Sequence, residues 1–361
     1  MIALSSEALA DFVGEIEAPD PTRLRQARLR LDRLTKPRGS LGRMEDIAAQ
    51  YISIRNGDQR FALNKAAYVF AADHGIAAEG VSAYGQEVTR QMVLNFLDGG
   101  AAINVLARLH HAALAIVDVG VDADFGNLPG LLHRKIRRGS RNMLQEPAMS
   151  EEEMMRALEV GLDLASSAQQ KKQTLIAIGE MGIGNTTAAS AITAVLTRQP
   201  PAAVTGTGTG LTAPAHAHKI RVVEAIVERH FGVNPQPRPR SLDILRRVGG
   251  LELAAMVGLV LGAARHRIAI IADGFISTAA AALAYALEPR VKYYLFAAHH
   301  SPEPGHRFLL EYLQLDPILS LDLRLGEGTG ALLAMPIIES AVRLYTDMAT
   351  FGSAGVSEAQ A

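Results

Sequence analysis

Six short apolar runs, each followed by a turn that carries glycine, acidic or histidine side chains, constrain the fold of this chain more than any other feature. Each run is apolar at successive positions rather than alternate ones, which suits a strand buried on both faces. Longer stretches with helical periodicity separate the runs, as expected of a parallel sheet covered by helices. The predicted strands cover residues 67–72, 114–119, 174–178, 202–205, 268–272 and 293–298.

The intervening stretches predict helices, and the chain ends read as helical too. We expect an α/β fold with a doubly wound, mostly parallel sheet and a second, smaller helical domain, because 361 residues exceed the usual size of one core. The large domain is predicted at 60–302, and the small one at 1–59 plus 303–361. The predicted helices are 86–96, 101–109, 151–170, 186–197, 215–230, 241–264, 276–288, 303–314 and 329–347.

Composition excludes several classes of protein. The net charge is -1, from 36 Lys+Arg and 37 Asp+Glu, so there is no basic field to attract nucleic acid. The chain has no cysteine, which excludes disulfides, thiolate nucleophiles and cysteine-ligated metals. The N-terminus is acidic where a signal peptide needs a basic flank, and no uncharged apolar stretch reaches the length of a membrane span. We expect a cytoplasmic protein with neither a nucleic-acid nor a membrane partner.

The residues able to do chemistry gather directly after the predicted strands. Ligands bind outside the carboxyl ends of strands in open α/β sheets, so this bias predicts a site at that edge. The segments are Asp73-His74-Gly75, Asp118-Val119-Gly120, 179–187 (GEMGIGNTT), 205–210 (TGTGTG), Asp273-Gly274 and His299-His300-Ser301.

Segments 179–187 and 205–210 resemble phosphate cradles. Glycines let backbone N–H groups approach an oxyanion, and a helix starting after each segment adds its positive dipole end. Neither segment matches a P-loop or a dinucleotide-binding fingerprint, and a plain turn is the alternative for each. Lys219 is predicted to supply a fixed positive charge to a phosphate, with an ordinary surface lysine as the alternative.

Glu180 and Glu327 are the candidate catalytic acids, because both stand beside glycines at the predicted edge. Partial burial raises the pKa of a carboxyl, which suits a general base that works near neutral pH. Each acid also has a purely structural alternative.

The histidine-rich segment 299–306 (HHSPEPGH) admits a metal site, since His299, His300, His306 and Glu303 have ligand chemistry. Pro302, Pro304 and Gly305 interrupt any helical ligand face. Hydrogen bonding to a ligand or helix capping is therefore favoured, and no metal site is predicted.

Seven motifs occur in order along nearly the whole chain: 36–42 (KPRGSLG), 72–81 (ADHGIAAEGV), 179–187, 207–211 (TGTGL), 272–275 (ADGF), 299–306 and 325–330 (LGEGTG). With these motifs the chain resembles the nicotinate-nucleotide–dimethylbenzimidazole phosphoribosyltransferase family. The resemblance implies a doubly wound domain, a small helical domain, a homodimer, and no metal or organic cofactor. It also implies transfer of phosphoribose from nicotinate mononucleotide to 5,6-dimethylbenzimidazole with inversion. The implied products are α-ribazole 5′-phosphate, used for the lower ligand of cobalamin, and nicotinate.

The same resemblance assigns roles to individual residues. Glu327 is the implied proton acceptor and Glu180 a second active-site acid. The implied phosphoribosyl contacts are Gly182, Gly208, Lys219 and Ser301, with Asp273 as a further substrate-binding candidate, and the implied walls of the base pocket are Gln91, Met181 and Leu325.

Departures from the family leave alternatives open. Thr207 stands where many relatives have an arginine, and acids are missing after Leu211, so the phosphate contacts of this loop are open. The segment 82–84 (SAY) borders the predicted base pocket and tunes which base fits. The alternatives are transfer to adenine or a phenolic base, a non-catalytic nucleotide-binding protein and, on fold analogy alone, a nicotinamide-dependent oxidoreductase, which the missing fingerprint disfavours.

Overall fold

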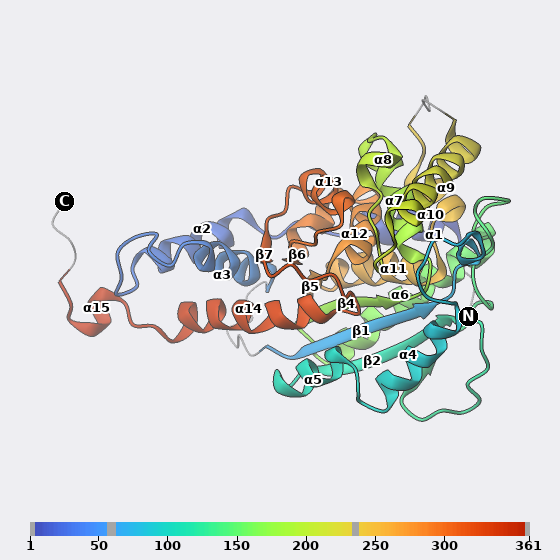
Figure 1. Ribbon diagram of the computed structural model, residues 1–361. Coiled ribbons are helices and arrows are strands. Elements are labelled where there is room, and N and C mark those ends of the chain that lie inside the picture. The colour runs from blue at the N-terminus through green and yellow to red at the C-terminus, as the bar shows by residue number, and fades with distance from the viewer. Residues whose placement is uncertain (1–3, 56–62, 233–237, 358–361) are drawn as a thin grey trace.

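The computed structural model describes residues 4–55, 63–232 and 238–357. Its strands form one parallel sheet in the order β3-β2-β1-β4-β5-β6-β7, so the winding direction reverses between β1 and β4 (Figure 1). This arrangement confirms the predicted doubly wound α/β class. The strands are β1 (Lys65–Ala72), β2 (Ala113–Gly120), β3 (Leu131–His133), β4 (Leu175–Met181), β5 (Ala269–Ala272), β6 (Leu295–His299) and β7 (Pro317–Leu319).

Helices cover both faces of the sheet. On one face α11 and α12 pack on the strands, and α6 packs on α11; α4, α5 and α14 cover the other face (Figure 1). The helices are α1 (Ser6–Gly14), α2 (Pro21–Asp32), α3 (Arg43–Ile54), α4 (Glu87–Leu97), α5 (Ala102–Leu109), α6 (Glu151–Gln170), α7 (Asn185–Thr197), α8 (Pro201–Val204), α9 (Ala213–Phe231), α10 (Ser241–Val248), α11 (Leu251–Arg265), α12 (Phe275–Leu287), α13 (Pro304–Leu313), α14 (Thr329–Asp347) and α15 (Phe351–Ala354), with 3-10 turns at η1 (Gly75–Glu79) and η2 (Pro289–Tyr294).

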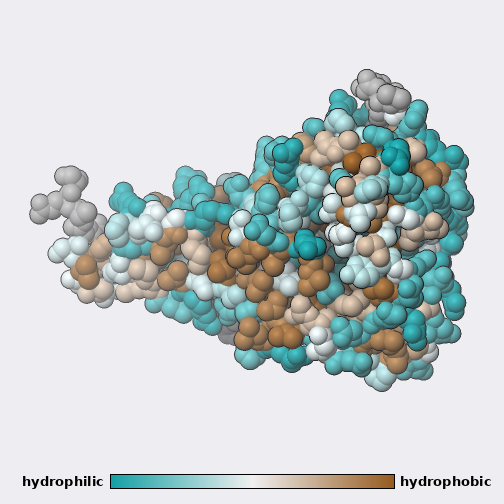
Figure 2. Space-filling model, in the orientation of Figure 1, coloured by the Kyte–Doolittle hydropathy of each residue, from teal (hydrophilic) through white to brown (hydrophobic). Residues whose placement is uncertain are grey.

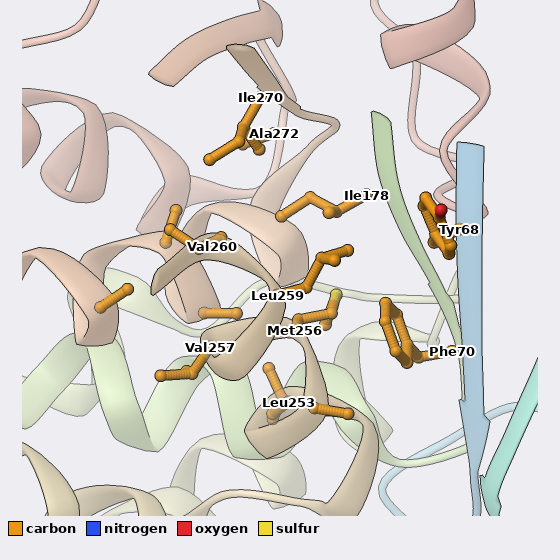
Figure 3. Close-up of a cluster of buried hydrophobic side chains, with 14 of the residues drawn as sticks. Tyr68, Phe70, Ile178, Leu253, Met256, Val257, Leu259, Val260, Ile270 and Ala272 are labelled. Atoms are coloured by element: carbon orange, nitrogen blue, oxygen red, sulfur yellow. The ribbon is translucent and has the colours of Figure 1, made fainter. Parts of the chain in front are cut away.

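The core lies between the sheet and α11. Phe70 of β1 and Ile178 of β4 point toward Met256 and Leu259 of α11, and all four side chains are fully buried (Figure 3). Burial of such side chains is the main driving force of folding. The core therefore fixes the central strands whose carboxyl ends carry the predicted site.

The backbones of α6 and α11 touch where two glycines face the partner helix. A Cβ at Gly161 would lie 2.0 Å from the carbonyl oxygen of Ala255, and one at Gly258 would lie 2.0 Å from that of Leu158. Neither contact has room for a side chain, so glycine is required at both positions.

Three details of the predicted elements are wrong. Residues 202–205 are not a strand, because Pro201 starts the short helix α8. The edge strands β3 and β7 were missed, since three residues are too few to form an apolar run. The helix predicted at 241–264 breaks at Gly249-Gly250, where a Cβ on Gly250 would lie 2.3 Å from Cε1 of His74.

The two chain ends meet beside the sheet. Helices α2 and α3 run alongside α14, and this group projects away from the strands (Figure 1). Leu34 forms a bridge with Thr350, and Arg30 donates hydrogen bonds to the carbonyls of Tyr345 and Thr346. In contrast, α13 packs on α12 and α7. The division into two domains stays a prediction, and its first boundary at residue 59 lies outside the described residues.

One apolar stretch, Glu87–Leu109, is long enough by length and composition to span a membrane, and no second helix in the described ranges is. It is not one continuous helix, because residues 98–101 separate α4 from α5, and both halves pack on the sheet. Figure 2 shows apolar residues gathered over α5 and α14 on this face, where Val105 and Leu109 are exposed.

Candidate active site

One cavity at the carboxyl ends of the strands brings together most of the predicted site residues. Its walls come from the turns after β4, β5 and β6, from the second glycine segment and from the turn that precedes α14. The first three of these walls follow strands, as the strand-end pattern predicted. The predicted residues in its lining are Glu180, Met181, Gly182, Gly208, Asp273, Ser301, Leu325 and Glu327.

Glu327 sits in a turn whose backbone is held in a rarely used conformation. Gly326, Glu327 and Gly328 have φ values of 84°, 64° and 85°, a left-handed region that is unfavourable for glutamate. Asp273 fixes this turn, since its Oδ2 accepts from the N–H of Gly328 at 3.1 Å and its Oδ1 from that of Ala331 at 2.8 Å. The structure thus gives Asp273 an anchoring role, and its contact with substrate stays a prediction.

Burial separates the proton affinities of the two candidate acids. It raises the pKa of Glu327 to about 7, with the charge of Asp273 adding to the shift. It raises the pKa of Glu180 to about 8, against the opposing hydrogen bond from Asn185. Both carboxyls therefore hold their protons to a higher pH than an ordinary glutamate, and Glu180 holds its proton more strongly than Glu327. This order is consistent with the prediction of Glu327 as the base.

Lys219 is not part of the cavity lining and lies behind it, against the lining residues Thr186 and Gly208. Its side chain is fully buried in α9, and its Nζ donates to Oγ1 of Thr186 at 2.8 Å. The same Nζ lies 3.0 Å from the position of a Cβ on Gly208, so Lys219 reaches the second glycine segment. Burial lowers the pKa of Lys219 to about 8, while the charge of Glu303 opposes the shift. These contacts rule out a surface lysine and fit an anion site.

The turn after β4 leads into the start of α7, whose residue Thr186 contacts Lys219. Gly184 has a φ of 98° and precedes α7, whose first turn carries no side-chain cap. A Cβ on Gly182 would lie 2.3 Å from the carbonyl oxygen of Ala72, so the turn packs directly on the end of β1. A helix start of this kind, with a lysine beside it, suits a phosphate.

The second glycine segment is held by a residue whose part in the site the sequence did not predict. The N–H of Gly208 donates to Oε1 of Glu303 at 2.8 Å. A Cβ on Gly206 would lie 2.2 Å from Oε2 of Glu303 and 2.7 Å from Cδ of Pro304, so Glu303 and the start of α13 pack closely on this segment. The sequence placed Glu303 only in the histidine-rich segment 299–306, where it was considered as a metal ligand.

The ring of His306 forms hydrogen bonds on both of its nitrogens, whereas Nε2 of His299 lies 3.9 Å from Oδ1 of Asp273. His306 accepts from the N–H of Ser301 through Nδ1 at 3.0 Å and shares a bond of 3.0 Å with Oγ1 of Thr278 through Nε2. Burial lowers the pKa of His306 to about 3, so it is neutral. Within the described parts of the chain, no group of three histidine or acidic side chains is arranged to hold a metal ion.

Comparisons with known proteins agree with this geometry. A family model described as a phosphoribosyltransferase matches residues 16–356. A relative from Geobacter sulfurreducens named nicotinate-nucleotide–dimethylbenzimidazole phosphoribosyltransferase is 50% identical over 351 residues, which cover 97% of this chain and 98% of the relative. The chain belongs to this phosphoribosyltransferase family. A relative of the same name from Chloroflexus aurantiacus is 48% identical, with 96% of this chain and 97% of the relative covered.

The crystal structure of CobT from Thermus thermophilus resembles this member of the family closely. The TM-score is 0.88 at 48% sequence identity, with 94% of this chain and 100% of the CobT chain covered. The family fold therefore extends through nearly the whole chain.

Two implied contacts of the phosphoribosyltransferase family lie at or beyond the rim of the cavity. Leu325 is 56% exposed and lines the rim. Gln91 is exposed on α4 and is not part of the lining, so its place in the base pocket stays a prediction. Segment 82–84 reaches the glycine segment through the N–H of Ala83, which donates to Oγ1 of Thr209 at 3.2 Å.

Proposed function

We propose that this enzyme transfers phosphoribose from nicotinate mononucleotide to 5,6-dimethylbenzimidazole with inversion, giving α-ribazole 5′-phosphate and nicotinate. The observation that carries the proposal is Glu327, a buried carboxyl with a pKa of about 7, in a cavity whose lining residue Thr186 accepts a hydrogen bond from the buried Lys219. The full-length similarity to proteins named for this reaction supports the choice of substrates.

One base suffices for the chemistry. The leaving ring of nicotinate mononucleotide is a pyridinium, so the electron pair of the breaking C1′–N bond neutralises the ring and no general acid is needed. One nitrogen of the benzimidazole attacks C1′ from the opposite face, which converts the β linkage to α. Its second nitrogen must lose a proton, and Glu327 accepts it.

The phosphate end positions the sugar for this attack. Lys219, the turn at Gly182 and the segment at Ser301 hold the 5′-phosphate, aided by the positive end of α7. Fixing the ribose in this way lowers the barrier by several kcal/mol, since the reacting atoms no longer have to find each other.

The proposed role of Glu180 begins when the cationic substrate is bound. Glu180 lines the cavity as a neutral acid, and a pyridinium or developing oxocarbenium ion beside it favours its ionised form. Its carboxylate then stabilises the positive charge at the reacting centre.

The decisive variant is Glu327→Gln, which keeps the size of the side chain and removes the base. We expect nicotinate release to fall by about 100-fold or more, whereas the affinity for nicotinate mononucleotide changes little. Glu311→Gln, on the exposed side of α13, is the matched control. Unchanged turnover of Glu327→Gln would remove this residue from the mechanism.

A panel of acceptors separates the main proposal from its alternatives. Adenine, phenol and 5,6-dimethylbenzimidazole are each mixed with nicotinate mononucleotide, and the rate of nicotinate release is compared. Strong preference for adenine or phenol would contradict the benzimidazole assignment, and binding of the mononucleotide without release in any mixture would indicate a non-catalytic binder. We further propose a cytoplasmic homodimer, to be tested by fractionation and by light scattering.

A further inference from the structure

Glu303 places a carboxylate inside the proposed phosphate site. It is the N-cap residue of α13, directly beyond the turn after β6, and it lines the cavity. Oε1 accepts the N–H of Gly208 at 2.8 Å, and Oε2 is buried with no hydrogen-bond partner among the described residues. A side chain has therefore taken a backbone donor that a phosphate oxygen would use.

The carboxylate of Glu303 lies close enough to Lys219 for the two charges to interact. Lys219 is fully buried, and the charge of Glu303 acts on its proton affinity. The donors around Gly208 thus face one resident anion before any substrate arrives. Oε2 of Glu303 lies against the backbone of Gly206, so the carboxylate spans the glycine segment from Gly206 to Gly208.

We propose that Glu303 is a resident anion that competes with the 5′-phosphate for the Gly208 N–H and for Lys219, and so limits the affinity of the enzyme for phosphorylated ligands. This inference rests on the proposed function, because it assumes that the substrate phosphate binds at Lys219.

Two electrostatic effects of Glu303 oppose each other. Its charge helps Lys219 stay protonated, which favours phosphate binding, and it repels the phosphate directly. A phosphate monoester carries about 1.5 to 2 negative charges at neutral pH, so at equal distance the repulsion is the larger effect. A bound phosphate also keeps Lys219 protonated without help from Glu303. The net effect of Glu303 is therefore to weaken binding.

Such weakening serves turnover. The substrate and the proposed product both carry a 5′-phosphate, so a site with Lys219 and free backbone donors would hold the product tightly as well. Glu303 favours release of the product, because its carboxylate accepts the hydrogen bond from Gly208 that the departing phosphate gives up. Product release limits many enzymes, and tighter binding alone does not raise their turnover.

The test uses calorimetric titration of the full chain with nicotinate mononucleotide and with nicotinate riboside, which lacks the phosphate. Glu303→Gln keeps an acceptor for the Gly208 N–H and removes the charge. We expect the Kd for the mononucleotide to fall by about tenfold, whereas the Kd for the riboside stays unchanged. Glu311→Gln removes one charge from the exposed side of the same helix and leaves both constants unchanged.

Unchanged or weaker binding of the mononucleotide, or equal tightening for both ligands, would overturn the inference. Glu303→Ser is a second variant in case the amide perturbs folding, because serine is a favoured N-cap residue for α13. Lys219→Met tests the underlying site. If it leaves mononucleotide binding intact, the proposed phosphate site itself is wrong; if only the Glu303 variants fail to tighten binding, the inference alone falls.

Discussion

Single side chains set the acid-base behaviour expected of the enzyme. Glu327 must be ionised to accept a proton, and burial raises its pKa to about 7. We therefore expect kcat/KM to fall tenfold per pH unit below about 7, measured as nicotinate release between about pH 5.5 and 8.5. If kcat/KM fell only below about pH 4.5, where an ordinary carboxyl titrates, the conclusion that burial raises the pKa of Glu327 would be contradicted.

The raised pKa of Glu180 makes the folded chain less stable as the pH rises. An ion-paired acid, whose pKa is lowered, has the reverse effect. The pKa of Glu180 rises from 4.5 to about 8 on folding, so between these values the folded chain keeps a proton that the unfolded chain has lost. Stability falls as the pH rises through this window and is lowest above it. Glu180→Gln should raise Tm by about 2–5 °C at about pH 8.5 and by little at about pH 4.5, measured by calorimetry. Equal shifts at both pH values would show that the side chain folds ionised.

Sequence reasoning found residues whose chemistry is visible locally and missed those defined by distant partners. Glu327 stood out because glycines flank it, and Lys219 because it lies in the helix that follows the second glycine segment. The clamp of Glu303 on Gly208 joins residues 95 positions apart, which no local pattern records. Asp273 was predicted to bind substrate, but its two hydrogen bonds to the start of α14 depend on the folded sheet.

Among the elements, the contact between α6 and α11 is the one most sensitive to a small change. Gly161→Ala would place a methyl group 2.0 Å from the carbonyl oxygen of Ala255, so the two helices must move apart. We expect a loss of about 3 kcal/mol in the free energy of unfolding, measured in urea. Gly352→Ala, where nothing lies within 4 Å, should change it by less than about 1 kcal/mol. Equal effects would mean that the helix contact adapts easily.

The central strands and long helices were predictable because buried runs and amphipathic periods are strong signals. The edge strands β3 and β7 could not be predicted in this way. β7 begins with Pro317, which cannot donate to a ladder, and β3 has a buried residue only at its first position. Helix α8 was mistaken for a strand because its short apolar run fits both patterns, and only Pro201 favours the helix.

At the scale of the whole molecule, contacts between the two chain ends hold α2 and the residues after it against the segment that follows α14. Deleting residues 348–361 removes the N–H of Phe351 that donates to Arg33 and the bridge from Thr350 to Leu34. We expect faster amide hydrogen exchange in α2, with no change in the affinity for nicotinate mononucleotide, because the cavity lies at the other end of α14. Deleting only 358–361 is the control. Lost nucleotide binding would show that the chain ends support the site directly.

The reversal of winding between β1 and β4 also determines when the site can exist during synthesis on the ribosome. Strands β1 to β3 are made first, and β4 to β7 are then added in order along the opposite edge of β1. Lys219 and the turn at Gly182 emerge before Glu327, which follows the last strand. The proposed phosphate contacts Lys219 and Gly182 are therefore synthesised before Ser301, and the proposed base Glu327 comes after all three, so we expect a nascent chain that ends before Glu327 to lack transfer activity.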